Sequence, residues 1–223
     1  MNKSTLYLFG LITLLVFPLP TIGWFYFYLE QPFSEIFQFE QFKIYPIIVG
    51  LIIGAVYAYL ASFVMESEVF DRSSINVEKI VRSMNLNLID CIFISLCAGI
   101  GEELLFRTGI QNYLGPIITS ILFVAIHGYL NPFNWRVSLY GLIVLPLILV
   151  ISYGFDEWGL WFAIAIHAAY DFVLFWIISN SEPNEPVSLN ASFGGLEDME
   201  EEQPLDPPQE LQDSNYRDVC WKR

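Results

Sequence analysis

The sequence predicts an all-α membrane protein, a polytopic bundle of about six transmembrane helices followed by a disordered acidic tail. Of its 223 residues, 55% are hydrophobic and only 15% are charged, which is less charge than soluble domains of this size carry. The apolar residues lie in long segments of about 20 residues, the length that a helix needs to cross a bilayer. Many of the acidic residues are instead concentrated at the end of the chain.

Six segments have the length and composition of a membrane span. They are residues 6–29, 44–65, 91–113, 116–135, 137–155 and 158–181. The first could instead be a signal peptide, but its apolar run exceeds the roughly 7–15 residues of such a signal, and no A-x-A cleavage pattern follows. Aromatic residues at 24–28 are typical of a membrane interface, so a span is the preferred interpretation.

These segments divide the chain into three parts. Residues 1–87 hold two predicted spans and an interfacial helix, residues 88–181 hold a core of about four spans, and residues 182–223 form the tail. The interfacial helix is indicated by apolar residues at helical spacing, and a surface-packed connector is the alternative. These residues are Val77, Ile80, Val81, Met84 and Leu88. A second stretch of this kind contains Phe33, Ile36, Phe37 and Phe42.

The tail carries 11 Asp and Glu against 3 Lys and Arg, a net charge of −8, which leaves −6 for the rest of the chain. Because it is also rich in proline and polar residues, we expect it to be disordered. An acidic chain of this kind gives no indication of nucleic-acid binding.

Basic residues in the short loops predict the orientation. In a six-span arrangement one side holds Lys3, Arg72, Lys79, Arg82 and Arg136. The other side holds Lys43 together with several acidic residues. Since Lys and Arg are enriched in cytoplasmic loops, both termini of this multi-pass protein are predicted to be cytoplasmic.

Ionisable residues inside the predicted spans are few, and they form a pattern. They are Glu102, Glu103 and Arg107 on the third span, His127 on the fourth, and His167 and Asp171 on the sixth. Such residues are costly in a bilayer and suggest function. At about 1.5 Å per residue, their positions along the helices match in depth, so the sequence predicts that they form one site.

Spacing suggests different roles for the two neighbouring glutamates. Glu103 and Arg107 are four residues apart, in the order that favours an ion pair on one helix face. Glu102 lies about 100° around the helix and has no local cation. A desolvated carboxylate of this kind is suited to general acid–base catalysis. The same spacing of four places Phe123 beside the imidazole of His127 and pairs His167 with Asp171.

Each of these features has a plainer interpretation. A Glu–Arg pair in a membrane helix often clamps helices together, and a membrane histidine is often a packed residue of the bundle. Their conjunction favours a site, and Gly99, Gly101 and Gly109 beside the acidic pair permit a close approach of another helix or a substrate.

Three motifs in this region resemble those of a known family. Residues 102–107 match EExxxR, residues 123–127 match FxxxH, and residues 167–171 match HxxxN/D. In this order they are similar to the CPBP family, which contains CAAX prenyl-protein endopeptidases and Abi-like, bacteriocin-processing or self-immunity proteins. The resemblance covers roughly residues 88–180. Because a compact six-span chain suits a prokaryotic member of this family, the resemblance implies a prokaryotic cell membrane.

The resemblance implies an intramembrane endopeptidase. Glu102 would then activate a water that His127 helps to hold. Glu103 would be both one of the catalytic residues and the partner of Arg107 in the ion pair that holds the site together. His167 and Asp171 would correspond to the positions that stabilise the tetrahedral oxyanion. Many family members have Asn at the position of Asp171, and an ionised carboxylate cannot donate to an oxyanion as an amide can. Asp171 could act in its protonated form, and the alternatives are that it orients His167 or binds a metal.

The resemblance leaves the cofactor open between two alternatives. The preferred one is a glutamate protease without a metal, because the spacing is not that of HExxH. The other is a zinc enzyme with Glu102, His127 and His167 as ligands. The partners expected in either case are the lipid bilayer and a peptide or protein substrate in or at the membrane, such as a lipidated or leader-bearing peptide.

Two other classes of function compete with the protease. One is a non-catalytic immunity or scaffold protein that retains the motifs for stability or binding. The other is a transporter, because Glu and His in a membrane also form proton relays. Against the transporter, the sequence lacks paired halves with interrupted spans.

Overall fold

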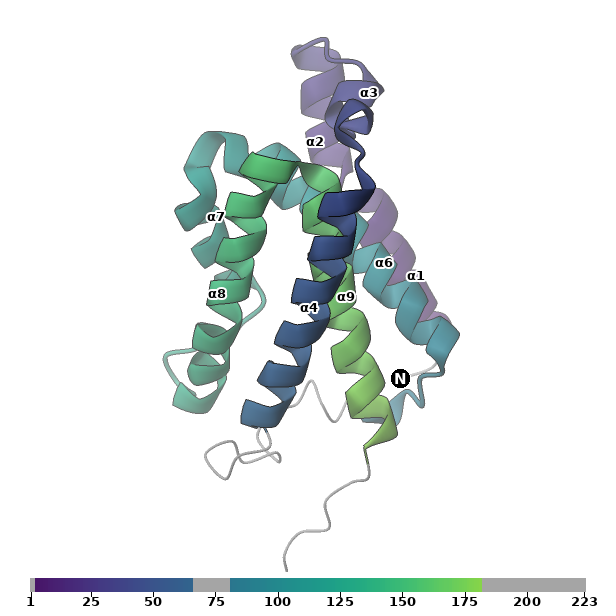
Figure 1. Cartoon of the computed structure of the whole chain (residues 1–223), viewed down its shortest axis with the longest axis vertical. Helices are drawn as coiled ribbons and strands as arrows, with labels where there is room; N and C mark the ends of the chain where they lie inside the picture. The colour runs from purple at the N-terminus through teal and green to yellow at the C-terminus, as the bar shows by residue number, and fades with distance from the viewer. Residues whose placement is uncertain (1–2, 66–80, 182–223) are drawn as a thin grey trace, which may run out of the picture. The chain divides into compact units, whose positions relative to one another are not determined.

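The computed structural model describes residues 3–65 and 81–181, and within these ranges every regular element is a helix. The predicted all-α class is therefore confirmed. Figure 1 shows the helices packed side by side as a bundle. The predicted disorder of the tail, and the first part of the predicted interfacial helix at 77–88, lie outside the described residues.

The first predicted span is built from three consecutive helical segments. These are α1 (Lys3–Val16), α2 (Leu19–Gly23) and the π-helical η1 (Trp24–Tyr28). The interruption falls at Pro18 and Pro20, because proline has no N–H for the helical hydrogen-bond ladder. Together the three segments are long and apolar enough to cross a membrane, over Lys3–Tyr28.

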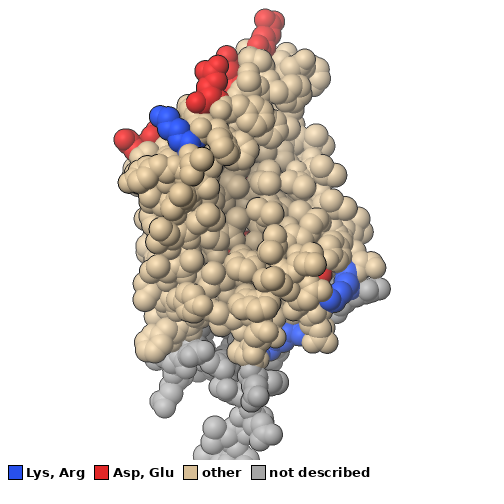
Figure 2. All heavy atoms as spheres, turned by 45° about the vertical axis from the view of Figure 1, so that its right-hand side comes forward, with Lys and Arg blue, Asp and Glu red and all other residues tan. Residues whose placement is uncertain are grey.

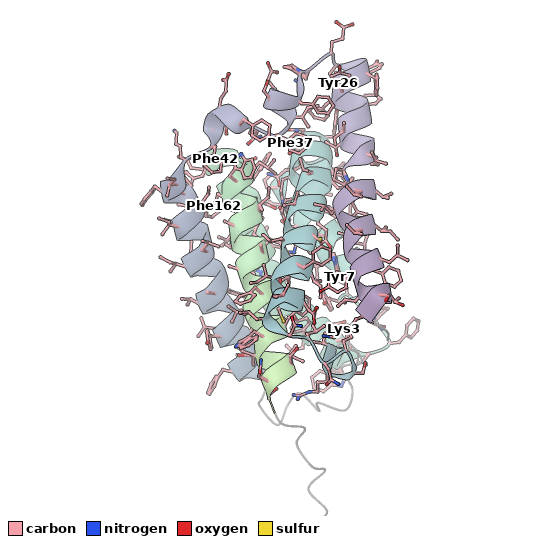
Figure 3. All side chains as sticks on the ribbon, turned by 90° about the vertical axis from the view of Figure 1, so that its right-hand side faces the viewer. Lys3, Tyr7, Tyr26, Phe37, Phe42 and Phe162 are labelled. Atoms are coloured by element: carbon pink, nitrogen blue, oxygen red, sulfur yellow. The ribbon has the colours of Figure 1, made fainter. Side chains whose placement is uncertain are left out.

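A short connector follows, with α3 (Phe33–Ile36) and η2 (Phe39–Gln41). Its Ile36 is fully buried, whereas Phe33 and Phe42 are exposed. In Figure 3, Tyr26, Phe37 and Phe42 lie at one end of the bundle and Lys3 at the other. Exposed aromatic rings gathered at one end are typical of the membrane–water interface.

Helices α4 (Ile44–Met65) and α9 (Leu160–Asn180) pack against each other in the bundle. They approach closely because Gly50 and Gly54 face α9. A Cβ at Gly54 would lie only 2.2 Å from the carbonyl oxygen of Ile166. Small residues allow such close backbone contact between membrane helices, and here the contact fixes the part of α9 next to His167.

Helix α6 (Leu88–Glu103) begins with a capping box, in which Asn87 and Asp90 each accept a hydrogen bond from the other's backbone N–H. Such a box satisfies two N–H groups at the helix start. The Asp90 carboxylate also accepts hydrogen bonds from Lys3 at 2.7 Å and from Tyr7 at 2.5 Å. Asp90 thereby ties the start of α1 to the start of α6.

After Glu103 the helix widens into a π-helical segment, η4 (Leu104–Gln111), and continues as α7 (Asn112–Ile126). Gly115 interrupts the helix with a φ of 73°, between the predicted third and fourth spans. The part after this break ends at Ile126, earlier than the predicted 135. A helix over 116–126 is only about 16 Å long, about half the thickness of the hydrocarbon core.

Helix α8 (Trp135–Trp158) turns at Gly159, whose φ is 85°, directly into α9. Among the described residues four helices can span a membrane by length and composition, over Lys3–Tyr28, Ile44–Val64, Val137–Trp158 and Leu160–Asn180. The six-span count is not confirmed and stays a prediction. Figure 2 shows charged side chains near the two ends and an uncharged surface between them, as expected for an integral membrane protein.

Candidate active site

A cavity of about 300 Å³ lies within the bundle, and most of its wall is aliphatic or aromatic. Residues from α1, α6, α7, α8 and α9 line it. Four of the six ionisable residues that the sequence singled out are on its wall, namely Glu102, His127, His167 and Asp171. The other two, Glu103 and Arg107, are fully buried behind it. The structure thus separates the two neighbouring glutamates.

Glu102 and His127 face each other on the cavity wall. The Oε2 atom of Glu102 lies 3.4 Å from Nε2 of His127, with the side chains 13% and 31% exposed. This distance exceeds that of a normal hydrogen bond, and Oε2 has no hydrogen-bond partner among the described residues. A water molecule in the cavity can form hydrogen bonds to both this carboxylate oxygen and this imidazole nitrogen.

The orientation of His127 is determined by its neighbours. Its Nδ1 lies 2.7 Å from the carbonyl oxygen of Phe123, and because a carbonyl can only accept, Nδ1 carries the proton. Nε2 is therefore the atom directed to Glu102. The imidazole stacks on the ring of Phe123 at 4.4 Å and faces the ring of Tyr129 at 6.0 Å. His127 thus presents one defined nitrogen to the cavity.

Glu103 uses both carboxylate oxygens to connect two helices. Its Oε2 accepts from Nε of Arg107 at 2.8 Å, and its Oε1 lies 2.6 Å from Nδ1 of His167. The sequence indicated the partner on the same helix but not His167, which is 64 residues away. The Nε2 atom of His167 is directed to Asp171, 3.4 Å from Oδ2. Both carboxylate oxygens of Glu103 are therefore engaged.

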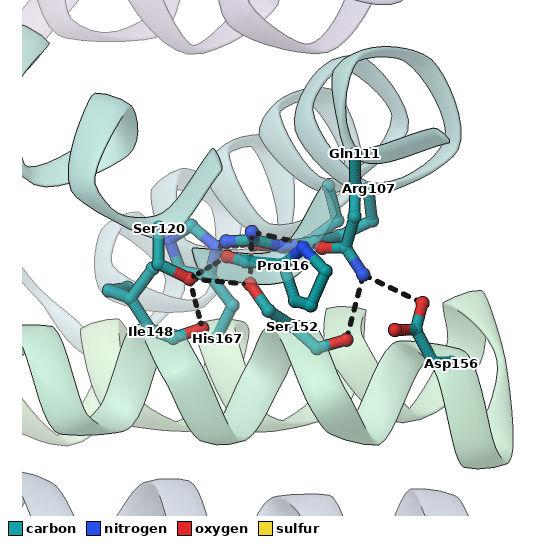
Figure 4. Close-up of polar contacts among 9 residues, drawn as sticks. Arg107, Gln111, Pro116, Ser120, Ile148, Ser152, Asp156 and His167 are labelled. Carbon is teal, nitrogen blue, oxygen red and sulfur yellow. Dashed lines mark hydrogen bonds and ion pairs between the residues drawn. The ribbon is translucent and has the colours of Figure 1, made fainter. Parts of the chain in front are cut away.

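A second layer of polar side chains, in addition to Glu103, surrounds Arg107 (Figure 4). Its Nη1 donates to Oγ of Ser152 at 2.7 Å, and Ser152 Oγ lies 2.7 Å from Oγ of Ser120. Gln111 donates to the carbonyl of Ser152 at 2.9 Å and to Asp156 at 2.8 Å. The widened turn of η4 carries both Arg107 and Gln111, and such turns are frequent at functional sites.

The sequence interpretation missed this layer. Ser120 and Ser152 are completely buried, and the only signal for them is a small hydroxyl in an otherwise apolar helix. Because buried polar groups require partners, such isolated hydroxyls could have been searched for as neighbours of Arg107.

Three tyrosines on the cavity wall were also missed. Tyr129, Tyr140 and Tyr170 line the cavity, and the hydroxyl oxygens of Tyr140 and Tyr170 are 3.2 Å apart. A tyrosine in an apolar segment resembles any other aromatic core residue. Only the packing of α8 against α9 shows that these hydroxyls meet at the site.

The fit of a metal ion can be examined from the same side chains. Over 3–65 and 81–181, no three His, Cys, Asp or Glu side chains are grouped so that they could hold a metal. Glu102, His127 and His167, the ligands of the zinc alternative, share the cavity wall. Glu103 holds Nδ1 of His167, which leaves Nε2 as the nitrogen that could bind a metal. The zinc alternative therefore stays a proposal.

Comparison with known proteins is consistent with this geometry. Residues 84–173 match the family model described as Type II CAAX prenyl endopeptidase Rce1-like. The matched segment is similar to this family. It includes all six ionisable residues of the site and nearly coincides with the region of resemblance, 88–180. Neither a search of curated proteins nor a search of solved structures found a match.

The match to the Rce1-like family has a direct consequence for the class of protein. That family is one of proteases, and in the described part of the chain four helices are long and apolar enough to span a membrane. The protein is therefore an integral membrane protein with a CAAX-protease-like core.

Proposed function

We propose that this protein is an intramembrane endopeptidase in which Glu102 activates the attacking water. The observation that carries the proposal is the pair formed by Glu102 and His127 on the wall of a largely apolar cavity. One oxygen of Glu102 has no hydrogen-bond partner in the described part of the chain, and it faces the imidazole at 3.4 Å.

The reaction that this geometry supports begins with a water that is bound to both Glu102 and His127. Glu102 takes a proton from this water while the oxygen of the water attacks the peptide carbonyl carbon. The resulting tetrahedral intermediate collapses when Glu102 returns the proton to the amide nitrogen, and the C–N bond breaks. The low dielectric of the cavity strengthens each electrostatic interaction along this path.

The remaining polar residues position the site. Glu103 orients His167 through Nδ1, and Arg107 neutralises the buried charge of Glu103. Buried carboxylates are tolerated when they are paired in this way. His167 and Asp171 face the cavity, where the developing negative charge on the carbonyl oxygen would lie.

The substrate that we propose is a peptide segment of a membrane-associated protein, including a lipidated or leader-bearing one. The cavity wall supports this class because α1 contributes the apolar side chains of Leu6 and Phe9. An extended peptide with small apolar side chains would be compatible with such a wall.

The decisive test compares Glu102→Gln with Glu103→Gln in purified protein that is assayed for proteolysis of membrane peptides. Glu102→Gln preserves shape but removes the base, so we expect activity to fall by about 10²–10⁴-fold with unchanged thermal stability. Glu103→Gln should lower thermal stability as well as activity, because it disturbs the ion pair. Full proteolysis by folded Glu102→Gln would refute the proposal.

Two further experiments distinguish the metal-free protease from the zinc enzyme and from a non-catalytic protein. Cleavage that persists in a strong chelator would eliminate the zinc alternative, and cleavage that is lost and then restored by zinc would support it. If the folded wild-type protein cleaves no peptide in a panel of membrane and leader substrates, the non-catalytic immunity or scaffold role becomes the better interpretation.

A further inference from the structure

The site has an unusual feature at Asp171, which lines the cavity where an oxyanion would be stabilised. An ionised carboxylate accepts hydrogen bonds but cannot donate one. From the structure we infer that the hydroxyl pair of Tyr140 and Tyr170 supplies the hydrogen-bond donor to the oxyanion. This inference rests on the proposed endopeptidase function.

The two tyrosines come from different helices and meet at the cavity. Tyr140 is on α8 and Tyr170 is on α9, and both side chains are buried. Their hydroxyl oxygens are 3.2 Å apart, and both residues line the same cavity as Glu102 and His127. Tyr170 follows His167 by three residues, which places the two on neighbouring positions of one helix face.

The two hydroxyls have two protons, and the hydrogen bond between them uses only one. Each phenol carries one proton at neutral pH, since its ordinary pKa is about 10. A single proton makes the hydrogen bond between the two hydroxyls, and in the described part of the chain neither hydroxyl has another partner. The second proton is therefore free to be donated to an oxygen in the cavity, and the first hydrogen bond would polarise it further.

The other donors near the cavity are already engaged. Nδ1 of His127 donates to the carbonyl of Phe123, Nδ1 of His167 is held by Glu103, and Nε2 of His167 is directed to Oδ2 of Asp171 at 3.4 Å. The hydroxyl of Thr13 donates to the carbonyl of Phe9. Tyr129 remains as a competitor, because it also lines the cavity and its ring packs edge-on against Tyr140 at 4.9 Å.

The test removes single hydroxyl groups and keeps the rings. The variants are Tyr140→Phe, Tyr170→Phe and their combination, with Tyr129→Phe as the competing arm. Tyr57→Phe is the matched control, because its hydroxyl donates to the carbonyl of Ile143 at 2.6 Å and Tyr57 is not part of the cavity wall.

We expect the combined variant to lose about 10²–10³-fold in kcat, the usual effect of removing one oxyanion donor, with KM nearly unchanged. Each single variant should lose less, because the remaining hydroxyl can still donate. Tyr57→Phe should retain kcat within a few-fold. The inference is overturned if the combined variant behaves like Tyr57→Phe, or if only Tyr129→Phe loses activity.

A second measurement separates donation from packing. Asp171→Asn introduces an amide donor beside the tyrosines, so in this background the loss caused by the double tyrosine variant should shrink to about 10-fold or less. A structural role would not be rescued in this way, and an unchanged loss would overturn the inference. Glu102→Gln is assayed in parallel. If it is active, the proposed function fails, whereas an inactive Glu102→Gln beside an active tyrosine double variant refutes only the role of the hydroxyls.

Discussion

Replacement of Arg107 by methionine tests whether the buried ion pair holds the site together. Arg107 and Glu103 are both completely buried, with Nε and Oε2 only 2.8 Å apart. The guanidinium also donates to Ser152 at 2.7 Å and lies 5.5 Å from the ring centre of Phe123. Methionine is similar in length and apolar, so the substitution removes the charge and its hydrogen bonds with little change in volume.

The expected loss is large because Glu103 would keep only its contact with His167. Removing one partner of a buried ion pair costs about 3–5 kcal/mol, since the remaining charge is left without compensation in a low dielectric. The combined Glu103→Gln and Arg107→Met variant removes both charges. Its loss should therefore be clearly smaller than the sum of the two single losses, with a coupling of about 1–3 kcal/mol.

Both quantities can be measured from reversible unfolding of the purified protein in mixed detergent micelles, followed by circular dichroism. Proteolytic activity is recorded on the same samples. A loss below about 1 kcal/mol for Arg107→Met would place the pair in the range of exposed salt bridges and would refute the reasoning. Strictly additive losses would show that the two residues do not act as a pair.

Two other predictions concern the helix contacts on which the site depends. Burial raises the pKa of Asp90, but hydrogen bonds from a backbone N–H and from Lys3, among others, lower the pKa to about 2. Because this folded-state pKa is below the ordinary value, the stabilisation is complete above about pH 4 and is lost as the pH falls through 2. In thermal melts, the stability of the wild type should fall at low pH in this way, whereas that of Asp90→Asn should not. Equal pH profiles of the two proteins would contradict this prediction. Gly54→Ala should lower the free energy of unfolding by about 1–3 kcal/mol, because its Cβ would collide with the carbonyl of Ile166. Gly23→Ala is the control and should leave the free energy of unfolding unchanged, because a Cβ at Gly23 has no atom within 4 Å. If Gly54→Ala also left it unchanged, α4 and α9 would be able to separate easily.

Much of the helical architecture could be predicted from the sequence because it is a local property. A long apolar segment forms a helix in a membrane to satisfy its own backbone hydrogen bonds. Four of the predicted spans correspond to helices of the required length. The region 91–135 was harder to predict, because π-helical turns and the break at Gly115 depend on how the surrounding helices pack.

For the site, the sequence by itself determined which ionisable residues lie in apolar segments and which of them share a helix face. The pairing of Glu103 with Arg107 and of Phe123 with His127 follows from a spacing of four residues. Only the tertiary structure decided that His167 meets Glu103 and that Tyr140 meets Tyr170. These contacts join residues of different helices, and their geometry depends on close packing between side chains far apart in the chain, which helical periodicity does not encode.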